Sequence, residues 1–284
     1  MSPSLLPVAL CLISAVTVAA TNLFVKRGGD VLSTRMLVSL VMAASVLPLL
    51  PFTPWPSAVL WQALGLSVMV HWCYQFAMVR ALHRGDLSLV FPVMRGLAPL
   101  LTAVLATIFL QETPSLTGWV GLITATAALI VFALPERSSE KAGRLRQAAL
   151  FWACLTALGI GAYSVADANG MRTADTLITY IVWLFILDSI GISSAVFWIR
   201  RGRVWGSLGD QLRNGITGGL LGAVSYAAAL WAFTLTEAAT VTALRETSVV
   251  FGAIFGALVL GEPFGRRRIL AAATLAISLI LIQI

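Results

Sequence analysis

Apolar residues run through this chain in long blocks that are separated by short polar connections. A bilayer core about 30 Å thick needs roughly 20 apolar residues per helix. On that rule the pattern predicts ten membrane-spanning helices, near residues 4-24, 35-51, 59-80, 87-110, 116-134, 147-167, 176-199, 214-235, 238-260 and 268-284. So many blocks with such short connections are not typical of a soluble core, and we expect an all-α integral membrane protein.

Two parts of the sequence repeat one another in outline. A shift of 150 residues aligns Arg95 with Arg245 and Glu112 with Glu262, and a shift of 142 places residues 15-28 on 157-170. Span 1 then matches span 6, and span 4 matches span 9, which gives two repeats of five spans. We expect the first repeat over 1-134, a basic linker over 135-146 and the second repeat over 147-284. Because five is odd, the second repeat must cross the membrane in the opposite sense, as an inverted pair.

Composition and charge agree with a membrane location. The chain is 59% hydrophobic and 11% charged, too apolar for the surface of a soluble domain. Of its 19 lysines and arginines, Arg95 and Arg245 lie inside spans, Arg172 lies in an even-numbered connection, and the others lie in odd-numbered connections. The positive-inside rule therefore predicts that the odd-numbered connections, linker included, are cytoplasmic and that both termini face outward. The net charge of +7 does not indicate nucleic acid, because the charges are not gathered on one element.

The first 25 residues of the chain, which include the first span, contain no Lys or Arg. A cleavable signal has a positively charged segment there. We therefore expect this segment to stay in the protein as a membrane span.

Ten spans in two repeats, with Gln-Glu or Gly-Glu closing the fourth span of each, resemble the EamA branch of the drug/metabolite transporter superfamily. The resemblance covers essentially the whole chain and is most specific at VFPVMRGLAPLLTAVLATIFLQE (90 to 112) and TALRETSVVFGAIFGALVLGE (242 to 262). It implies a carrier of the bacterial inner membrane that moves small organic metabolites by alternating access, often outward. It also implies cytoplasmic termini, whereas the charge pattern of this chain predicts the opposite.

Two arginines inside spans need an explanation, because an arginine at mid-helix costs about 2.5 to 3.5 kcal/mol on insertion scales. One interpretation is that Arg95 and Arg245 bind a carboxylate, phosphate or phosphonate of the substrate, since a guanidinium offers oxyanions a planar fork of donors. A second is internal ion pairing with Glu246 or Asp188, and a third is snorkelling to an interface. Arg245 and Glu246 are about 100° apart on a helix and should face different neighbours.

Other residues are candidates for the substrate path. Asp188 or Glu246 could carry a coupling proton, because burial favours the neutral form of a carboxyl group. His71, Tyr74 and Tyr226 could line the path as aromatic walls with polar tips, with plain helix packing as the alternative.

Proline positions single out span 4 as the candidate gating helix. Pro92 and Pro99 free backbone carbonyls, which is tolerated in a membrane only where protein or water supplies partners. Glu112 and Glu262, at span ends, are expected to serve packing or helix-terminus chemistry.

No enzyme motif is recognisable. The sequence has no nucleotide-binding loop, no catalytic Ser, His and Asp set, and no metal-ligand spacing around its two histidines, so we expect neither catalysis nor a cofactor or metal. We expect a secondary active carrier, a monomer or homodimer, that exports a small anionic or zwitterionic metabolite, with a proton or ion as candidate coupling partner. The alternatives are a non-transporting membrane sensor or scaffold subunit, and a channel.

Overall fold

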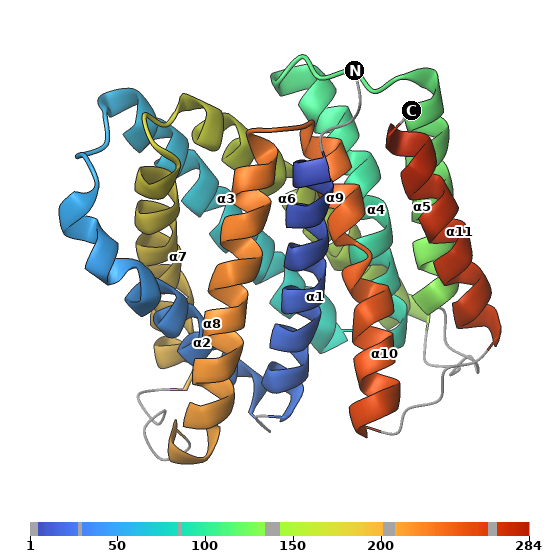
Figure 1. Cartoon of the computed structure of the whole chain (residues 1–284). Coiled ribbons are helices and arrows are strands. Elements are labelled where there is room, and N and C mark those ends of the chain that lie inside the picture. Colours follow the sequence, from blue (N-terminus) through green and yellow to red (C-terminus); the bar gives the residue numbers. More distant parts are fainter. Residues whose placement is uncertain are drawn as a thin grey trace.

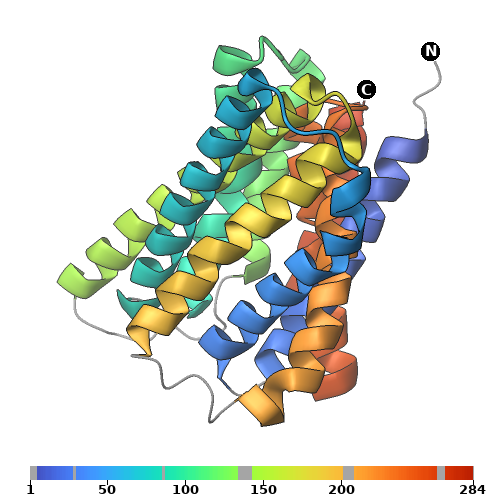
Figure 2. The same cartoon turned by 90° about the vertical axis from the view of Figure 1, so that its left-hand side faces the viewer.

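The computed structural model describes residues 5–27, 30–84, 87–133, 143–200, 208–260 and 266–283, and all regular structure in these ranges is helical. In chain order the elements are α1 (Leu5–Arg27), α2 (Val31–Val46), the 3₁₀ helix η1 (Leu47–Phe52), α3 (Ala58–Arg84), α4 (Leu87–Phe109), α5 (Leu116–Ala133), α6 (Gly143–Thr173), α7 (Leu177–Ile199), α8 (Leu208–Phe233), α9 (Ala238–Arg245), α10 (Ser248–Leu260) and α11 (Arg266–Gln283) (Figure 1). They form one bundle, and a view turned by 90° shows them running in broadly the same inclined direction (Figure 2).

Each segment predicted as a span coincides with a helix or a pair of helices, but two are not continuous. Span 2 ends as η1, because Pro48 at its start and Pro51 further along have no N–H to give α-helical bonds. The prediction of one continuous helix over 238-260 was wrong, since α9 ends at Arg245 and α10 begins at Ser248.

Length and composition would let six of the described helices cross a membrane, and three further apolar helices are 10–17 residues long. The all-helical fold is therefore confirmed, and the total of ten spans stays a prediction.

Helices of the two halves are interleaved. The most extensive contacts pair α3 with α6, α1 with α8, α5 with α11 and α4 with α6, and α2 also packs on both α7 and α8. If each helix is replaced by its counterpart in the other half, the α3–α6 pair becomes the α8–α1 pair. The α5–α11 and α2–α7 pairs stay the same. This pattern is that of a pseudo-two-fold axis relating two repeats, and it makes the interface between the repeats the centre of the molecule.

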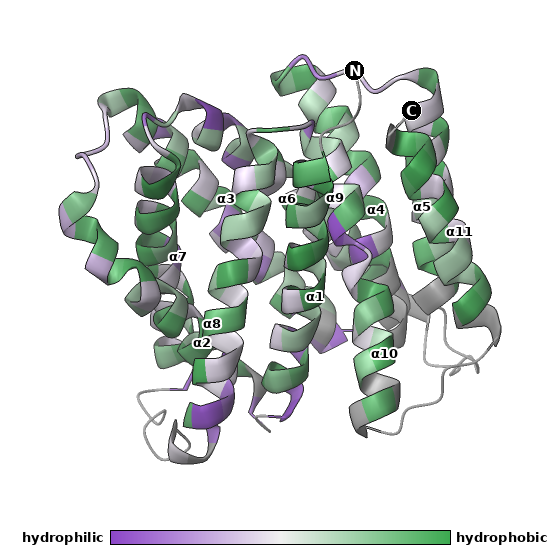
Figure 3. Cartoon of the chain, viewed as in Figure 1, coloured by the Kyte–Doolittle hydropathy of each residue, from purple (hydrophilic) through white to green (hydrophobic). Residues whose placement is uncertain are grey.

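The outer surface of the bundle is apolar. Leu5, Phe52, Trp198 and Leu258 are each at least 80% exposed, and Figure 3 shows hydrophobic residues along most of the length of the helices. In water such a surface would drive aggregation, whereas in a bilayer it meets lipid.

Basic residues mark one end of the bundle. Helices α1, α3 and α7 end on the lower side of Figure 1, whereas α1 begins and α11 ends on the upper side. Lys26 and Arg27 close α1, and Arg84 closes α3. Arg200, just after α7, lies 2.5 Å from the carboxylate of Asp30, which begins α2.

The pKa of Asp30 is lowered from its ordinary value. Burial acts against ionisation, but hydrogen bonds from Ser33 and the charge of Arg200 outweigh it. The connections that follow α1 and α7 are thus tied together by an ion pair at this end.

Candidate functional site

An ion pair between the repeats lies inside the bundle. Nε of Arg95 in α4 is 3.3 Å from Oε2 of Glu246, whose side chain is 2% exposed. Nη2 of Arg95 also donates to Oγ of Ser248 at 3.1 Å. In this conformation Arg95 therefore shows the internal pairing that was one of its alternatives, and contact with a substrate stays a prediction.

Glu246 owes its position to the break between α9 and α10. Thr247 N donates to Leu244 O at 3.2 Å and Val249 N to Glu246 O at 3.0 Å, which are the three-residue steps of a tighter helix. Discontinuous helices commonly build the binding sites of transporters.

The corresponding helix of the first repeat behaves differently. α4 runs unbroken from Leu87 to Phe109 through Pro92 and Pro99, so the helix with the prolines is continuous and its counterpart without them is not. A gating role for either helix stays a prediction.

Arg245 faces another neighbour, as the 100° offset between adjacent residues predicted. Its Nε donates to Oγ of Ser14 in α1 at 3.0 Å, and its guanidinium carbon lies 5.5 Å from the centre of the Tyr226 ring. Oγ of Ser225 in α8 donates to Ser14 O at 2.7 Å and holds α1 against α8. The ion pairs found among the described residues do not include Arg245.

Sequence reasoning missed Asp167, which is fully buried in α6. Its Oδ1 accepts hydrogen bonds from Oγ of Ser67 and, at 3.0 Å, from the hydroxyl of Tyr180, and its Oδ2 accepts one from Tyr226. The predicted span ended at this residue, as though it met the membrane surface, whereas α6 continues to Thr173. The rule that buried charges in membranes are functional would have found it with a longer span.

His71 and Tyr226 lie beside this aspartate. Nε2 of His71 is 2.8 Å from the Tyr226 hydroxyl and 3.8 Å from Oδ2 of Asp167. The His71 ring stacks on Tyr163 with centroids 4.4 Å apart, and Tyr163 also contacts Tyr74 at 5.1 Å. The structure therefore brings the three predicted aromatic residues into one cluster.

Asp188 is at the edge of this cluster, on α7. Its Oδ1 accepts a hydrogen bond from Nε2 of Gln75 in α3 at 3.1 Å. No ion pair to Asp188 occurs within the described ranges, so the pairing of Asp188 with an arginine, which the sequence left open, is not present there.

A second charged group lies at the upper end of Figure 1, where α4, α6, α8 and α9 end or begin. Oε1 of Glu112 is 2.5 Å from Nη1 of Arg172, and its Oε2 accepts from the backbone N of Ala238, the first residue of α9, at 2.8 Å. Arg172 in turn donates to the backbone oxygens of Phe233 and Thr236 at 2.9 and 3.1 Å. Both charges thus satisfy helix termini, as expected for Glu112, whereas Glu262 lies outside the described residues.

The neighbouring Glu237 responds to this group. Burial raises the pKa of Glu237, the negative charge of Glu112 raises it further, and Arg172 partly opposes the rise. Glu237 precedes α9 but its side chain caps nothing, so Glu112 caps α9 in its place.

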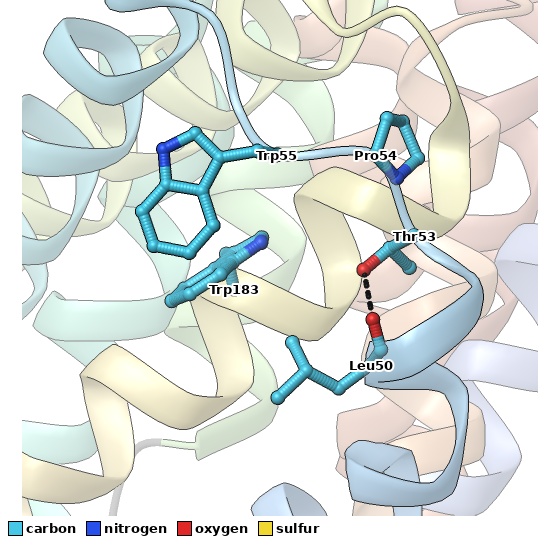
Figure 4. A pocket seen from close by; sticks show the side chains of 5 residues that line it. All are labelled: Leu50, Thr53, Pro54, Trp55 and Trp183. Carbon is cyan, nitrogen blue, oxygen red and sulfur yellow. Dashed lines mark hydrogen bonds between the residues drawn. The ribbon is translucent and has the colours of Figure 1, made fainter.

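A pocket of about 220 Å³ opens elsewhere, lined by Leu50, Thr53, Pro54, Trp55 and Trp183 (Figure 4). Trp183 packs edge-on against Trp55 and Trp61, with ring centroids 5.1 and 4.9 Å apart. Tryptophans gather at membrane interfaces, and this pocket has no charged lining residue, so it is separate from the buried charges. No group of His, Cys, Asp and Glu side chains within the described ranges could hold a metal ion.

Comparison with known proteins gives a family and a fold. The model of the EamA-like transporter family matches residues 5–134 and 147–284, one match for each half. A solved structure titled "Crystal structure of protein" superposes with a TM-score of 0.78 at 17% sequence identity, covering 97% of this chain and 95% of that one. A search of curated proteins finds no significant match.

Proposed function

Because this chain belongs to the EamA-like transporter family, a family of membrane transporters and not of enzymes, we propose that it is a secondary active carrier for a small anionic or zwitterionic metabolite. Amino-acid-like compounds, carboxylates and phosphonates are the substrate classes. In this proposal ten spans cross the bacterial inner membrane, the odd-numbered connections are cytoplasmic, and the direction of transport is outward.

The observation that carries the proposal is Arg245. This arginine is inside the bundle at the junction of α1, α8 and α9, and its contacts there are a serine hydroxyl and an aromatic face. A guanidinium in a low-dielectric setting gains most when it binds an oxyanion in a forked geometry. Arg95 differs because Glu246 already neutralises it. Arg245 is therefore the primary anion site, and the Arg95–Glu246 pair is a contact that can reform during the cycle.

Alternating access follows from the position of these groups. Arg95 belongs to the first repeat and Glu246, Ser248 and Arg245 to the second, so a relative movement of the repeats would change their contacts. The break between α9 and α10 supplies a place where the second repeat can bend, and α4 with Pro92 and Pro99 is its partner in gating.

A ligand panel on purified protein tests the proposal. A ligand that binds only the folded state raises the melting temperature by mass action. At a ligand concentration of a hundred times Kd, the free energy of unfolding rises by roughly 2.7 kcal/mol. We expect an anion or zwitterion to stabilise both the native protein and an Arg213→Gln control. Arg213 is an exposed residue near the start of α8. Arg245→Gln should fold and lose the response.

The opposite result is equally clear. If Arg245→Gln melts early and no ligand shifts the native protein or the control, the arginine is structural and an anion carrier is excluded. A sensor or scaffold subunit, which binds nothing to transport, would then be the better account.

A further inference from the structure

A chain of hydrogen bonds runs from α3 through α8 to α6. Nε2 of His71 is 2.8 Å from the hydroxyl of Tyr226, which in turn reaches Oδ2 of Asp167. On its other side, Nδ1 of His71 is 2.9 Å from the backbone oxygen of Ser67. The Ser67 hydroxyl is also 3.3 Å from Nδ1, but it donates its hydrogen to Asp167. A carbonyl oxygen only accepts, so Nδ1 carries a hydrogen.

The number of hydrogens in this chain decides its protonation. If His71 is neutral with its hydrogen on Nδ1, and Asp167 is ionised, then Nε2 and Oδ2 both need the single hydrogen of Tyr226. One buried contact would then lack a hydrogen, which is unfavourable because a buried acceptor stays unsatisfied. One further proton removes the conflict. It can sit on Nε2, which then donates to Tyr226 while Tyr226 donates to Oδ2. It can also sit on Oδ2, which then donates to Tyr226 while Tyr226 donates to Nε2.

We propose that His71, Tyr226 and Asp167 together bind one exchangeable proton, which is the coupling ion of the carrier proposed above. The assignment as coupling ion rests on that proposed function, whereas the binding of the proton does not. It differs from the sequence expectation, which named Asp188 and Glu246 for this role.

Charge balance in the surroundings favours the protonated cluster. Ser67 from α3, Tyr163 from α6 and Tyr180 from α7 face it as neutral groups. Among the described residues, the other ionisable groups near it are Asp188 on α7, within electrostatic reach of His71 and Asp167, and Arg245 on α9 over the Tyr226 ring.

If both aspartates were ionised, they and the one arginine would leave one net negative charge in this part of the interior, and the added proton would cancel it. The Arg95–Glu246 pair is already balanced. A net charge in a low-dielectric region is costly, so the proton stabilises the arrangement of the repeats seen in this structure.

The cluster spans the interface between the repeats, since His71 is in the first and Tyr226 and Asp167 are in the second. Loss of the proton breaks one link between them. An anion at Arg245 would add negative charge beside Tyr226 and so favour the protonated form. Proton and anion then move together, and outward transport draws on the gradient of the substrate itself.

Histidine NMR on the full-length protein tests the cluster without any substrate. The chain has two histidines, and His83 near the end of α3 is exposed, so it serves as an internal control for His71. Infrared difference spectra report in parallel whether a carboxylic acid is present. Across the pH range in which the protein stays folded, we expect one proton to leave, seen either as loss of the His71 imidazolium or as loss of a carboxylic acid band. Asp167→Asn should abolish this step.

Two tyrosine variants give a matched comparison, since both remove one hydroxyl from Asp167 but only Tyr226 contacts His71. Tyr226→Phe should uncouple the His71 titration from Asp167, and Tyr180→Phe should leave the two linked. The native protein decides the matter even if Asp167→Asn fails to fold. A neutral His71 beside an ionised carboxylate throughout this range would overturn the proposal, as would a proton that never leaves.

The two proposals fail separately. If the ligand panel finds an anion that needs Arg245 while the cluster shows no exchangeable proton, the carrier stands and its coupling site is elsewhere. If the cluster releases a proton but no ligand binds, the proton site stands and the anion carrier does not.

Discussion

Arg95 and Glu246 illustrate how a buried ion pair constrains a membrane protein. Each charge alone would be costly inside the bundle, and together they offset most of that cost. The pair is better regarded as a specific link between the repeats than as a source of stability, because well-packed apolar residues can replace such pairs without loss.

A double-mutant cycle tests this link. Arg95→Gln or Glu246→Gln alone leaves one buried charge without its partner and should destabilise the protein by about 3 to 5 kcal/mol. The double variant removes both charges and should be clearly more stable than the sum of the single changes predicts. Thermal unfolding in one detergent measures all four proteins. Additive losses would show that the two side chains do not interact, contrary to the 3.3 Å contact.

The candidate charges could be found from sequence, but their partners could not. The rarity of charge in apolar spans identifies Arg95, Arg245, Glu246 and Asp188. Pairing depends on which helices meet, and nothing local to Glu246 says that it meets Arg95 from α4 in preference to its neighbour in sequence. Asp167 was missed because the hydropathy of α6 falls before the helix ends.

Helix termini explain two sequence features that hydropathy leaves unexplained. Arg172 is the basic residue that departs from the charge pattern, and its contacts with Phe233 and Thr236 show that it serves the carboxyl end of α8. The second feature is Gln111, whose backbone conformation ends a helix. Gln111 has a φ of 59°, the left-handed conformation that ends many helices and that glycine adopts most readily. Gly261 occupies the matching position in the sequence of the second repeat.

Gln111→Gly should therefore stabilise the protein. It relieves a left-handed conformation that costs a residue with a Cβ about 1 to 2 kcal/mol, less the added flexibility of glycine in the unfolded chain. A net gain of about 0.5 to 1 kcal/mol should appear as a higher melting temperature. Gln111→Ala keeps the Cβ and should show no gain, and equal behaviour of the two variants would argue against strain at this position.

Glu112 gives a second test at this end of the bundle. Glu112→Ala removes both the cap of α9 and the partner of Arg172, and should cost about 1 to 2 kcal/mol. Glu112→Gln keeps an oxygen that can accept from Ala238 but loses the ion pair, so an intermediate loss is expected. Thermal unfolding of both variants checks this order, and an unaffected Glu112→Ala protein would refute the capping role.

The break between α9 and α10 could not be predicted from the sequence. Residues 245 to 248 are Arg-Glu-Thr-Ser, with neither proline nor glycine to interrupt a helix. At this tighter turn Arg245 and Glu246 make polar contacts with different helices, and those contacts arise only in the assembled bundle. Prolines, the usual local signal, indicated α4, which is continuous.

For the molecule as a whole, the two repeats account for both the packing and the charge distribution. The repeats were visible in thin sequence similarity, and the interleaving of their helices is a property of the fold that local patterns do not encode. Sidedness rests on the charge pattern alone, which predicts outward-facing termini although the family resemblance implies the opposite.

Cysteine labelling in intact cells decides the sidedness. The native Cys73 and Cys154 are exposed on the surface of the bundle, so the test begins from a cysteine-free variant. Thr113→Cys, after α4, should react with a membrane-impermeant reagent from outside. Ser138→Cys, in the basic linker, should react only after the membrane is opened. The reverse pattern would invert the orientation proposed here.

The central claim is that this protein carries an anionic metabolite past Arg245 between its two repeats. Counterflow in vesicles reconstituted with the native protein and with Arg245→Gln tests it most directly, using the ligand that stabilises the native protein most. We predict saturable uptake of labelled ligand that is driven by unlabelled ligand inside and is lost in Arg245→Gln. Flux that neither saturates nor shows counterflow, or no flux at all from folded native protein, would contradict the claim.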